Sequence, residues 1–349
     1  MRAIVLHQHG GIEALVPAEL PDPEPGPGEV VVRVRACALN RLDLWVRAGW
    51  PGLDLPMPHI LGSDVAGELH AVGPGVGNDL APGAEVVVSP GVSCGHCREC
   101  VGGQDNLCDG YGILGETTTG GYAELLRVPA VNIFPKPPEL SFAEAAAVPL
   151  VFLTAWQMLV DKADVRPGQT VLVHAGGSGV GSAAIQIARM LGATVITTAS
   201  TKAKLAQAAA LGAHHGIDYS SGEFAREARR LNGGRGVDVV IEHVGAATWE
   251  QSLLSLRRGG AVVVCGASSG WDVQTDLRRV FFRQLAILGS TMGPKARLHD
   301  IFDRVRAGAL RPVIDRVLPL SEAREAHRLL EDRSQFGKVV LQVGSDLPI

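Results

Sequence analysis

Residues 170–191 read TVLVHAGGSGVGSAAIQIARML, and this stretch combines a short apolar run, a glycine-rich turn and an amphipathic run. The run at 171–173 is short and rich in β-branched residues, which indicates a strand buried on both faces. After the turn, Val180, Ala184, Ile187 and Leu191 recur at helical spacing and predict a helix. The stretch therefore predicts a strand, a tight turn and a helix in direct succession.

Glycines stand in this turn where a backbone bends sharply, approaches a ligand closely and lets a helix pack on a strand. The helix N-terminus presents unpaired N–H groups and a partial positive charge, which suit a pyrophosphate. We therefore expect a dinucleotide site, although the motif alone also fits an ordinary steric turn. The residues of the turn are Gly176, Gly177, Ser178, Gly179, Val180 and Gly181.

The segments that follow the turn support the prediction of a dinucleotide-binding site. Amphipathic stretches separate most of a series of short strand-like runs, and six strands with helical connections predict an open parallel sheet. The further strand-like runs lie at 195–198, 216–218, 237–244, 261–266 and 286–290, and the amphipathic stretches at 202–211, 224–231 and 248–256.

Length and composition limit the class of protein. A chain of 349 residues is longer than one core usually fills, so we expect two domains. The sequence is 46% hydrophobic and carries a formal net charge of -4, which suits a soluble globular protein with no nucleic-acid partner. No cleavable apolar leader and no membrane-spanning apolar run is evident, so we expect a cytoplasmic protein.

Four of the six cysteines lie in the segment CGHCRECVGGQDNLC, as Cys94, Cys97, Cys100 and Cys108. In a cytoplasmic chain, this spacing favours a metal site over a disulfide pair. Four thiolates enclose Zn²⁺ tetrahedrally and leave no position open for water, so we predict one structural zinc ion. An iron–sulfur cluster and four unrelated thiols are the alternatives.

The two ends of the chain have a different pattern from the middle. Up to about residue 150, short strands at 29–36, 65–72, 84–89 and 121–128 predict a small all-β barrel. A helical stretch at 142–160 leads into the glycine turn. After residue 290, we expect a helix at 296–307, a strand at 313–317, a helix that begins at Ser321 and a strand at 338–343. These last strands have no glycine turn, so we assign them to the first domain.

Segments spread over almost the whole chain resemble the medium-chain dehydrogenase/reductase superfamily, which includes zinc alcohol dehydrogenases and quinone oxidoreductases. They include PGPGEV, ACALNRLDLWVRAG, PHILGSDVAGEL, GGYAELLRVP and VPLVFLTAWQML, besides the cysteine segment and the glycine turn. The resemblance implies an α/β fold, with a doubly wound Rossmann sheet inserted into a GroES-like β-barrel catalytic domain. It also implies a small-molecule substrate and a homodimer or homotetramer.

The domain limits implied by this resemblance are residues 1–150 for the GroES-like domain, 151–290 for the Rossmann domain and 291–349 for the return to the first domain. The zinc lobe would occupy about residues 91–110.

The chain departs from the zinc alcohol dehydrogenases at their catalytic metal site. Those enzymes bind zinc through a Cys in Cys-x-x-Asp, a His in Gly-His-Glu and a Cys four residues before a Thr. The corresponding positions here are Asn40, Ser63 and Leu150. An amide, a hydroxyl and an alkyl group do not hold zinc at neutral pH, so we expect no catalytic metal ion. Leu42 stands where that branch has the hydroxyl residue that relays the alcohol proton.

The segment that begins at Asn40 is similar instead to the quinone oxidoreductase branch, which implies metal-free hydride reduction of a quinone or an activated double bond. The developing oxyanion needs a hydrogen-bond donor, and the amide of Asn40 is the candidate. Trp45 is either a flat wall for the substrate or part of the barrel core. Asp43 and Asp64 match acids that stand behind the zinc ligands and complete the candidate catalytic set.

Two other functions remain open at this stage. His59 lies near Asp43 and Asp64 in the sequence, so a rearranged catalytic metal site would make the chain an alcohol or aldehyde dehydrogenase. The second alternative is a protein that binds the nucleotide without catalysis.

The predicted cofactor is NADPH, with NADH as a second cofactor. NAD-binding sheets carry an acidic residue at the end of the second strand, and here residues 198–201 read TAST. Lys204 follows, either as a partner of the 2′-phosphate or as a solvated helix lysine. Tyr219 matches a tyrosine that similar quinone reductases place beside this phosphate. The candidate cofactor-binding residues outside the turn are Thr154, Ser200, Lys204, Tyr219 and Gly266.

Overall fold

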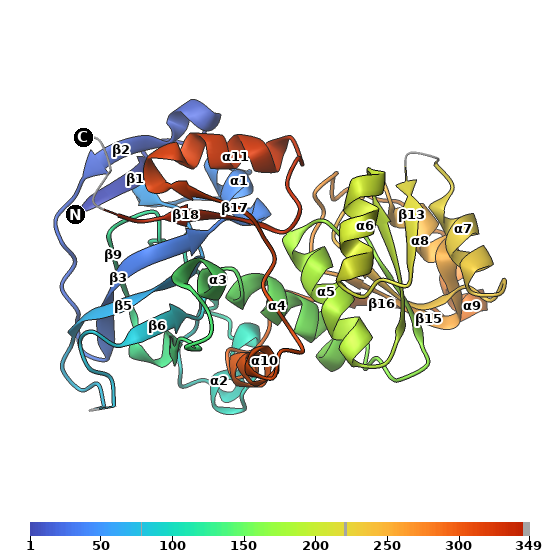
Figure 1. The fold of residues 1–349 in the computed structure, drawn as a ribbon, viewed down its shortest axis with the longest axis horizontal. Coiled ribbons are helices and arrows are strands. Elements are labelled where there is room, and N and C mark those ends of the chain that lie inside the picture. The colour runs from blue at the N-terminus through green and yellow to red at the C-terminus, as the bar shows by residue number, and fades with distance from the viewer. Residues whose placement is uncertain (78, 220–221, 345–349) are drawn as a thin grey trace. The chain divides into compact units, whose positions relative to one another are not determined.

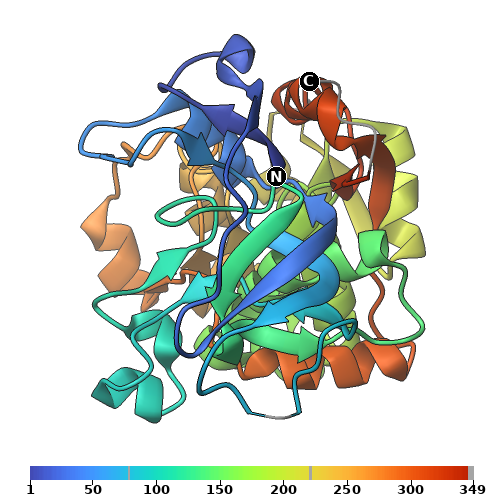
Figure 2. The same ribbon diagram turned by 90° about the vertical axis from the view of Figure 1, so that its left-hand side faces the viewer.

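The computed structural model describes residues 1–77, 79–219 and 222–344. The chain separates into two compact units. The first consists of Met1–Leu150, Pro294–Phe302 and Pro312–Ile349, and the second of Val151–Gly293 and Asp303–Arg311. The N-terminal strand β1 (Arg2–Leu6) and the late helix α11 (Ala323–Glu331) both belong to the first unit, as Figures 1 and 2 show.

The first unit is built on a sheet of seven described strands, in the order β10-β6-β5-β3-β18-β17, with β9 also paired with β3. Its longest strand, β3, reads EVVVRVRACA, and its valines are buried while Arg33 is exposed. Val30, Val31 and Val32 are buried in succession, so this part of β3 is covered on both faces, and Arg33 is its one fully exposed residue. The strands are β3 (Glu29–Ala38), β5 (Asp64–Val72), β6 (Glu85–Val88), β9 (Leu125–Pro129), β10 (Ile133–Pro135), β17 (Ile314–Pro319) and β18 (Lys338–Gln342).

The register of β18 brings the end of the chain back to its beginning. β18 runs antiparallel to β3, with Leu341 opposite Cys37 and Val340 opposite Ala38. Lys338, the first residue of β18, therefore lies near the end of β3, where the chain enters α1 (Arg41–Ala48). This pairing is what positions the candidate site of the first unit.

Smaller sheets and helices complete the first unit. A three-stranded sheet has the order β2-β1-β4, and a two-stranded sheet joins β7 to β8. The strands are β2 (Val16–Glu19), β4 (His59–Ile60), β7 (Gly91–Val92) and β8 (Gly112–Ile113), and the helices that belong wholly to this unit are α1, α2 (Arg98–Val101), α3 (Phe142–Ala146) and α11.

The second unit contains a parallel sheet with the strand order β13-β12-β11-β14-β15-β16, which is the doubly wound order and confirms the predicted fold class. β11 (Thr170–Val173) is fully buried, as its apolar run predicts. The other strands are β12 (Thr194–Ala199), β13 (His215–Asp218), β14 (Val237–Glu242), β15 (Leu256–Val264) and β16 (Ala286–Gly289). The helices that connect them are α5 (Gly179–Met190), α6 (Lys202–Ala210), α7 (Phe224–Leu231), α8 (Trp249–Ser255) and α9 (Leu277–Arg283).

The strand predicted at 261–266 begins earlier, at Leu256 in β15. Three further predicted elements also differ from the observed ones. The helical stretch expected at 142–160 is broken into α3 and α4 (Pro149–Trp156), followed by the π-helix η4 (Gln157–Lys162). Pro149 explains the break, because proline lacks an N–H and disfavours helix in the residue before it. The strand expected at 121–128 begins only at Leu125.

The helix expected from Ser321 is the third of these further differences. Ser321 lies inside the 3₁₀ turn η6 (Leu320–Glu322), and α11 begins at Ala323. The helix expected at 296–307 is present as α10 (Arg297–Arg306). In the described part of the chain, no helix combines the length and apolar character needed to cross a membrane.

Candidate functional site

Asn40 and Asp43 lie at the start of α1 and are both buried. The Asn40 N–H donates to Oδ2 of Asp43 at 2.6 Å, and the Gly62 N–H donates to Oδ1 of the same carboxylate at 3.0 Å. Burial raises the pKa of Asp43 to about 7, although the two N–H groups act in the opposite direction. Asp43 therefore ties the start of α1 to the segment before β5.

The side chain of Asn40 is held by two charged groups. Its Nδ2 donates to Oδ2 of Asp64 at 3.0 Å, and Lys338 Nζ donates to its Oδ1 at 2.5 Å. Lys338 Nζ also lies 3.0 Å from Oδ2 of Asp64, so the three side chains form a closed hydrogen-bonded triangle. The other Asp64 oxygen accepts the Leu150 N–H at 2.8 Å.

Only one hydrogen of the Asn40 amide is left for the predicted role as a donor to a substrate. One amide hydrogen is directed to Asp64, and the other makes only a long contact of 3.4 Å with the Ala38 carbonyl. Nothing in the sequence around Asn40 predicts its contact with Lys338, which is 298 residues further along the chain. The only local signal was a charged residue at the start of the apolar strand KVVLQ.

The other candidate residues of the first unit have distinct environments. Trp45, on α1, is 37% exposed, so it is not a closed core residue. Ser63 is buried, and its hydroxyl has no hydrogen-bond partner among the described residues. His59 is buried on β4, and its Nε2 lies 3.1 Å from the Gly115 carbonyl oxygen.

The four cysteines of the predicted metal lobe lie together in the first unit. Cys94, Cys97, Cys100 and Cys108 have sulfur atoms within 4.8 Å of one another. The Cys94 and Cys100 sulfurs are 3.8 Å apart, which is the edge, about 3.8 Å, of a tetrahedron with Zn–S distances of ~2.3 Å. This donor set fits a structural metal ion. Among the described residues, no other group of three or more His, Cys, Asp or Glu converges in this way.

In the second unit, the glycine turn is tightly packed, and two of its glycines have no room for a side chain. A Cβ at Gly176 would lie 2.4 Å from Thr197 Oγ1, and a Cβ at Gly181 would lie 2.3 Å from the Ala175 carbonyl oxygen. Ser178 is the N-cap of α5, and its hydroxyl accepts the Gly181 N–H at 2.9 Å. The turn therefore packs tightly against the sheet, and α5 directs its N-terminus toward the turn.

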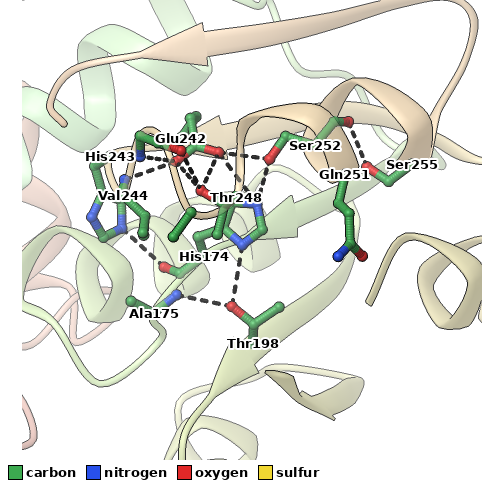
Figure 3. Close-up of polar contacts among 12 residues, drawn as sticks. His174, Ala175, Thr198, Glu242, His243, Val244, Thr248, Gln251, Ser252 and Ser255 are labelled. Carbon is green, nitrogen blue, oxygen red and sulfur yellow. Dashed lines mark hydrogen bonds and ion pairs between the residues drawn. The ribbon is translucent and has the colours of Figure 1, made fainter. Parts of the chain in front are cut away.

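A chain of buried hydrogen bonds lies directly behind this turn (Figure 3). Ser252 donates to Oε2 of Glu242 at 2.6 Å, so its oxygen accepts from Nε2 of His174 at 2.9 Å. His174 Nδ1 then accepts from the Thr198 hydroxyl at 3.2 Å, and Thr198 Oγ1 accepts the Ala175 N–H at 3.1 Å. We refer to Glu242, Ser252, His174 and Thr198 as the buried relay; the donor directions follow from hydrogen-bond balance.

The buried relay joins segments from both sides of the cofactor turn. Ala175 has a φ of 44°, in the left-handed region that a residue with a side chain rarely adopts, and its N–H ends the relay. At the other end, Glu242 accepts the N–H groups of Val244 and Gly245 and the hydroxyl of Thr248. One carboxylate thus organises the loop after β14 and, through three side chains, the turn after β11.

Sequence reasoning missed His174 and Glu242, although a signal was present. Each ends or directly follows an apolar strand of a parallel sheet, and the carboxyl ends of such strands are where ligands bind. Burial lowers the pKa of His174 to about 4, and the nearby Glu242 acts in the opposite direction. His174 is therefore neutral at physiological pH.

Four of the five candidate cofactor residues outside the turn follow strands of the same sheet or begin its helices. Ser200 follows β12 and is exposed, Tyr219 follows β13 and is 39% exposed, and Gly266 follows β15. Lys204 lies in the first turn of α6, where its N–H donates to Thr201 Oγ1. Thr154 lies apart on α4, buried, with its hydroxyl 3.9 Å from the sulfur of Met292.

Comparison with known proteins places this fold and site in a family. Residues 26–138 match the alcohol dehydrogenase GroES-like domain, and residues 179–307 match the zinc-binding dehydrogenase family. A 2-haloacrylate reductase from a Burkholderia species is 33% identical over 97% of this chain and 98% of its own. An acryloyl-coenzyme A reductase from Metallosphaera sedula is 30% identical over 98% and 99%.

A solved structure described as an NAD-dependent alcohol dehydrogenase is 55% identical, with a TM-score of 0.95 over 99% of this chain and 100% of that one. Together with the family matches, these similarities show that the chain belongs to the medium-chain dehydrogenase/reductase superfamily. It is an NAD(P)-dependent oxidoreductase.

Proposed function

We propose that this chain transfers a hydride from NADPH to the electron-poor carbon of an α,β-unsaturated carbonyl compound or a quinone, without a catalytic metal ion. The observation that carries the proposal is the triangle of Asn40, Asp64 and Lys338, in which a buried ammonium group polarises an amide. Two relatives, the reductases of 2-haloacrylate and acryloyl-CoA, are named for substrates in which a double bond adjoins a carboxyl or thioester group.

The acidic groups near Asn40 are poorly placed to hold a metal. Both oxygens of Asp43 accept backbone N–H groups, and both oxygens of Asp64 have partners. His59 directs its Nε2 to a backbone carbonyl. A cation at this site would need three well-oriented ligands, and each of these groups already has another role.

The bound nicotinamide supplies the hydride. Asn40 donates its second amide hydrogen, which makes only the 3.4 Å contact with Ala38, to the oxygen on which negative charge develops. Lys338 and Asp64 are positioning residues: they hold Oδ1 and one Nδ2 hydrogen, and the ammonium charge makes the remaining N–H a stronger donor. Trp45, with its exposed indole, contacts the flat part of the substrate.

For the cofactor, we propose that the glycine turn and the N-terminus of α5 hold the pyrophosphate of NADPH. Lys204 and Tyr219 hold the 2′-phosphate, since the end of β12 carries no acid that would repel it. The cysteine cluster holds one structural zinc ion, with four thiolates and no open position for catalysis.

We also propose that the protein is a homo-oligomer. β16 is the last strand of the second unit's sheet, and its Ile287 is 43% exposed. Helix α9, which precedes it, exposes Leu277, Phe281 and Phe282. An exposed apolar patch beside an open strand edge is typical of a self-association surface.

Oxidation of an alcohol with NAD⁺ is the second candidate function. The observation that favours it is the 55% identity to a structure described as an NAD-dependent alcohol dehydrogenase. That function would require a base near Asn40 to take the alcohol proton, with or without a cation to stabilise the alkoxide oxygen. Asp43, whose pKa burial raises to about 7, is the candidate base.

The two candidates are separated by steady-state kinetics with Asn40 variants. We expect wild type to oxidise NADPH with an enone or quinone, and Asn40→Ala to lower kcat by about 10²-fold with a smaller change in KM, as is typical when one oxyanion donor is lost. Trp50→Phe, at a tryptophan that packs on the core of the first unit, is the control. Turnover of primary alcohols with NAD⁺, and none of enones or quinones with NADPH, contradicts the proposal.

A further inference from the structure

A cavity of about 500 Å³ in the second unit is lined almost wholly by arginine. This volume lies within the range of ~300–1,000 Å³ that small-molecule sites occupy. No apolar or acidic side chain contributes to the lining, so any occupant is held by charge and hydrogen bonds. The lining residues are Arg229, Gly234, Arg235, Arg257, Arg258 and Arg283.

The positive charge of this arginine cavity is only slightly compensated. Arg257 Nε donates to Oδ1 of Asp238 at 2.5 Å, and the other oxygen of this carboxylate accepts the Thr170 N–H. In the described part of the chain, the other four arginines of the cavity form no ion pair. Five guanidinium groups therefore line the cavity, and one carboxylate outside the lining, that of Asp238, compensates a single one of them.

Backbone carbonyls keep these guanidinium groups close together. Arg229 and Arg283 both donate to the carbonyl oxygen of Leu256, and Arg258 donates to that of Phe282 at 3.0 Å. Burial, and then the charges of Arg229 and Arg258, lower the pKa of Arg283. Like charges held this close repel one another unless an anion lies between them.

The arginine cavity lies at the amino ends of the strands of the sheet, and the glycine turn lies at their carboxyl ends. Arg235 precedes the amino end of β14, and Arg257 lies at the amino end of β15. The glycine turn follows the carboxyl end of β11, and β11 runs parallel to β14. A ligand in the arginine cavity is therefore not the dinucleotide bound at the turn.

We propose that the arginine cavity is a second anion site, which binds an oligophosphate such as pyrophosphate. Guanidinium groups form paired hydrogen bonds with phosphate oxygens, and five of them around one cavity suit an anion of several charges better than a single carboxylate. The cavity offers no aromatic side chain for a base to stack on, so the phosphate chain itself is what is recognised.

The test is isothermal titration of the full-length protein with pyrophosphate, in wild type and in the double variant R235Q/R258Q. Both arginines are exposed, so their replacement leaves the half-buried Arg229, Arg257 and Arg283 in place. We expect binding at least about tenfold weaker in the double variant, since each lost charge-assisted hydrogen bond matters. R226Q is the control, because Arg226 lies on the same helix α7, is exposed and pairs with Glu223 outside the cavity.

Four further results decide the proposal. Tighter binding of tripolyphosphate than of pyrophosphate, and weaker binding of orthophosphate, supports a site whose affinity rises with the charge of the anion. Binding of ADP no tighter than that of pyrophosphate supports recognition of the phosphate chain without a contribution from the base. Equal pyrophosphate affinity in wild type and R235Q/R258Q overturns the proposal. Pyrophosphate binding that NADPH abolishes and R235Q/R258Q leaves unchanged also overturns it, because the anion then occupies the glycine turn.

Discussion

The ammonium group of Lys338 lies 3.0 Å from Oδ2 of Asp64, and both side chains are almost completely buried. Buried charges are costly to desolvate, and the pair is tolerable because each group has further hydrogen bonds, from Lys338 to Asn40 and from the Leu150 N–H to Asp64. This pair joins β18 to β5 and fixes the orientation of the Asn40 amide between them.

Replacement of Lys338 by Met should impair both folding and catalysis. It leaves Asp64 as an uncompensated buried charge, which should lower the free energy of unfolding by ~3–5 kcal/mol, and it frees Oδ1 of Asn40. Urea unfolding and steady-state kinetics measure the two effects. Lys136→Met is the matched control: Lys136 has a buried side chain paired with Glu85, so it should lose stability with little change in kcat. Equal kcat in K338M and wild type contradicts the positioning role.

Replacement of Cys94 by Ser should remove the structural metal. We expect less than one zinc per chain and a lower Tm, with kcat per folded molecule largely retained, because a closed site of four thiolates contributes to folding and not to hydride transfer. Elemental analysis and thermal unfolding measure this. Cys265→Ser, outside the cluster, should keep the zinc. Complete loss of activity in a fully folded C94S protein counts against a purely structural ion.

Replacement of Lys204 by Ala should weaken NADPH binding by about tenfold and leave NADH binding almost unchanged, because only NADPH carries the 2′-phosphate. Fluorescence titration with both cofactors tests this. Lys202→Ala, in the same first turn of α6 but exposed, is the control and should change neither affinity. Equal losses for NADPH and NADH remove Lys204 from this role.

Replacement of Ser252 by Ala should weaken dinucleotide binding by disconnecting Glu242 from His174. Glu242 and His174 each lose a hydrogen-bond partner, which should lower the free energy of unfolding by ~1–3 kcal/mol. The strained turn at Ala175 should then be held less firmly. Ser255→Ala is the control, since Ser255 is equally buried on α8 but only donates to the Ser252 carbonyl. The two variants should lose similar stability while only S252A raises the Kd for NADPH; the same Kd in both would confine the relay to folding.

Stability should fall as the pH is lowered below ~6.5, the ordinary pKa of histidine. Burial, followed by the charge of Arg47, lowers the pKa of His327 to about 3, and burial lowers that of His174 to about 4. At a pH between 6.5 and these lowered pKa values, the two histidines are protonated in the unfolded chain and neutral in the folded chain. A fall in pH therefore favours unfolding.

The part of this pH dependence that comes from His327 can be tested by itself. His327 Nδ1 lies 3.2 Å from Nη1 of Arg47, and its Nε2 lies 3.1 Å from the hydroxyl of Tyr122. In urea unfolding at pH 7.5, 6 and 5, His327→Gln should therefore give a smaller decline than wild type. The exposed His70, replaced by Gln, should not alter the slope. An unchanged slope in H327Q shows that His327 does not carry the effect.

Features set by short segments were predictable from the sequence. The spacing of apolar residues and glycines around Gly176 predicts the strand, the turn and the helix. The spacing of the cysteines within residues 94–108 predicts the cluster. The break between α3 and α4 was also local: Pro149 marks it, and apolar periodicity across 142–160 concealed it.

The arrangement around Asn40 was not predictable in the same way. Lys338 reaches Asn40 only because β18 pairs with β3, and no periodicity in either segment specifies that register. The relay has the same origin, since His174, Thr198 and Glu242 end three different strands and meet only in the sheet. A polar residue at the end of a buried parallel strand is the signal that would have found two of them.

Hydride transfer without a catalytic metal ion is best tested by the zinc content per chain. It is measured by elemental analysis on protein purified without added metal and assayed in parallel with NADPH and an enone. We predict one zinc per chain, held by the four cysteines, and NADPH-dependent reduction that persists in that preparation. Two zinc ions per chain, with alcohol oxidation that disappears when the second is removed, would contradict this prediction and make alcohol dehydrogenase the function.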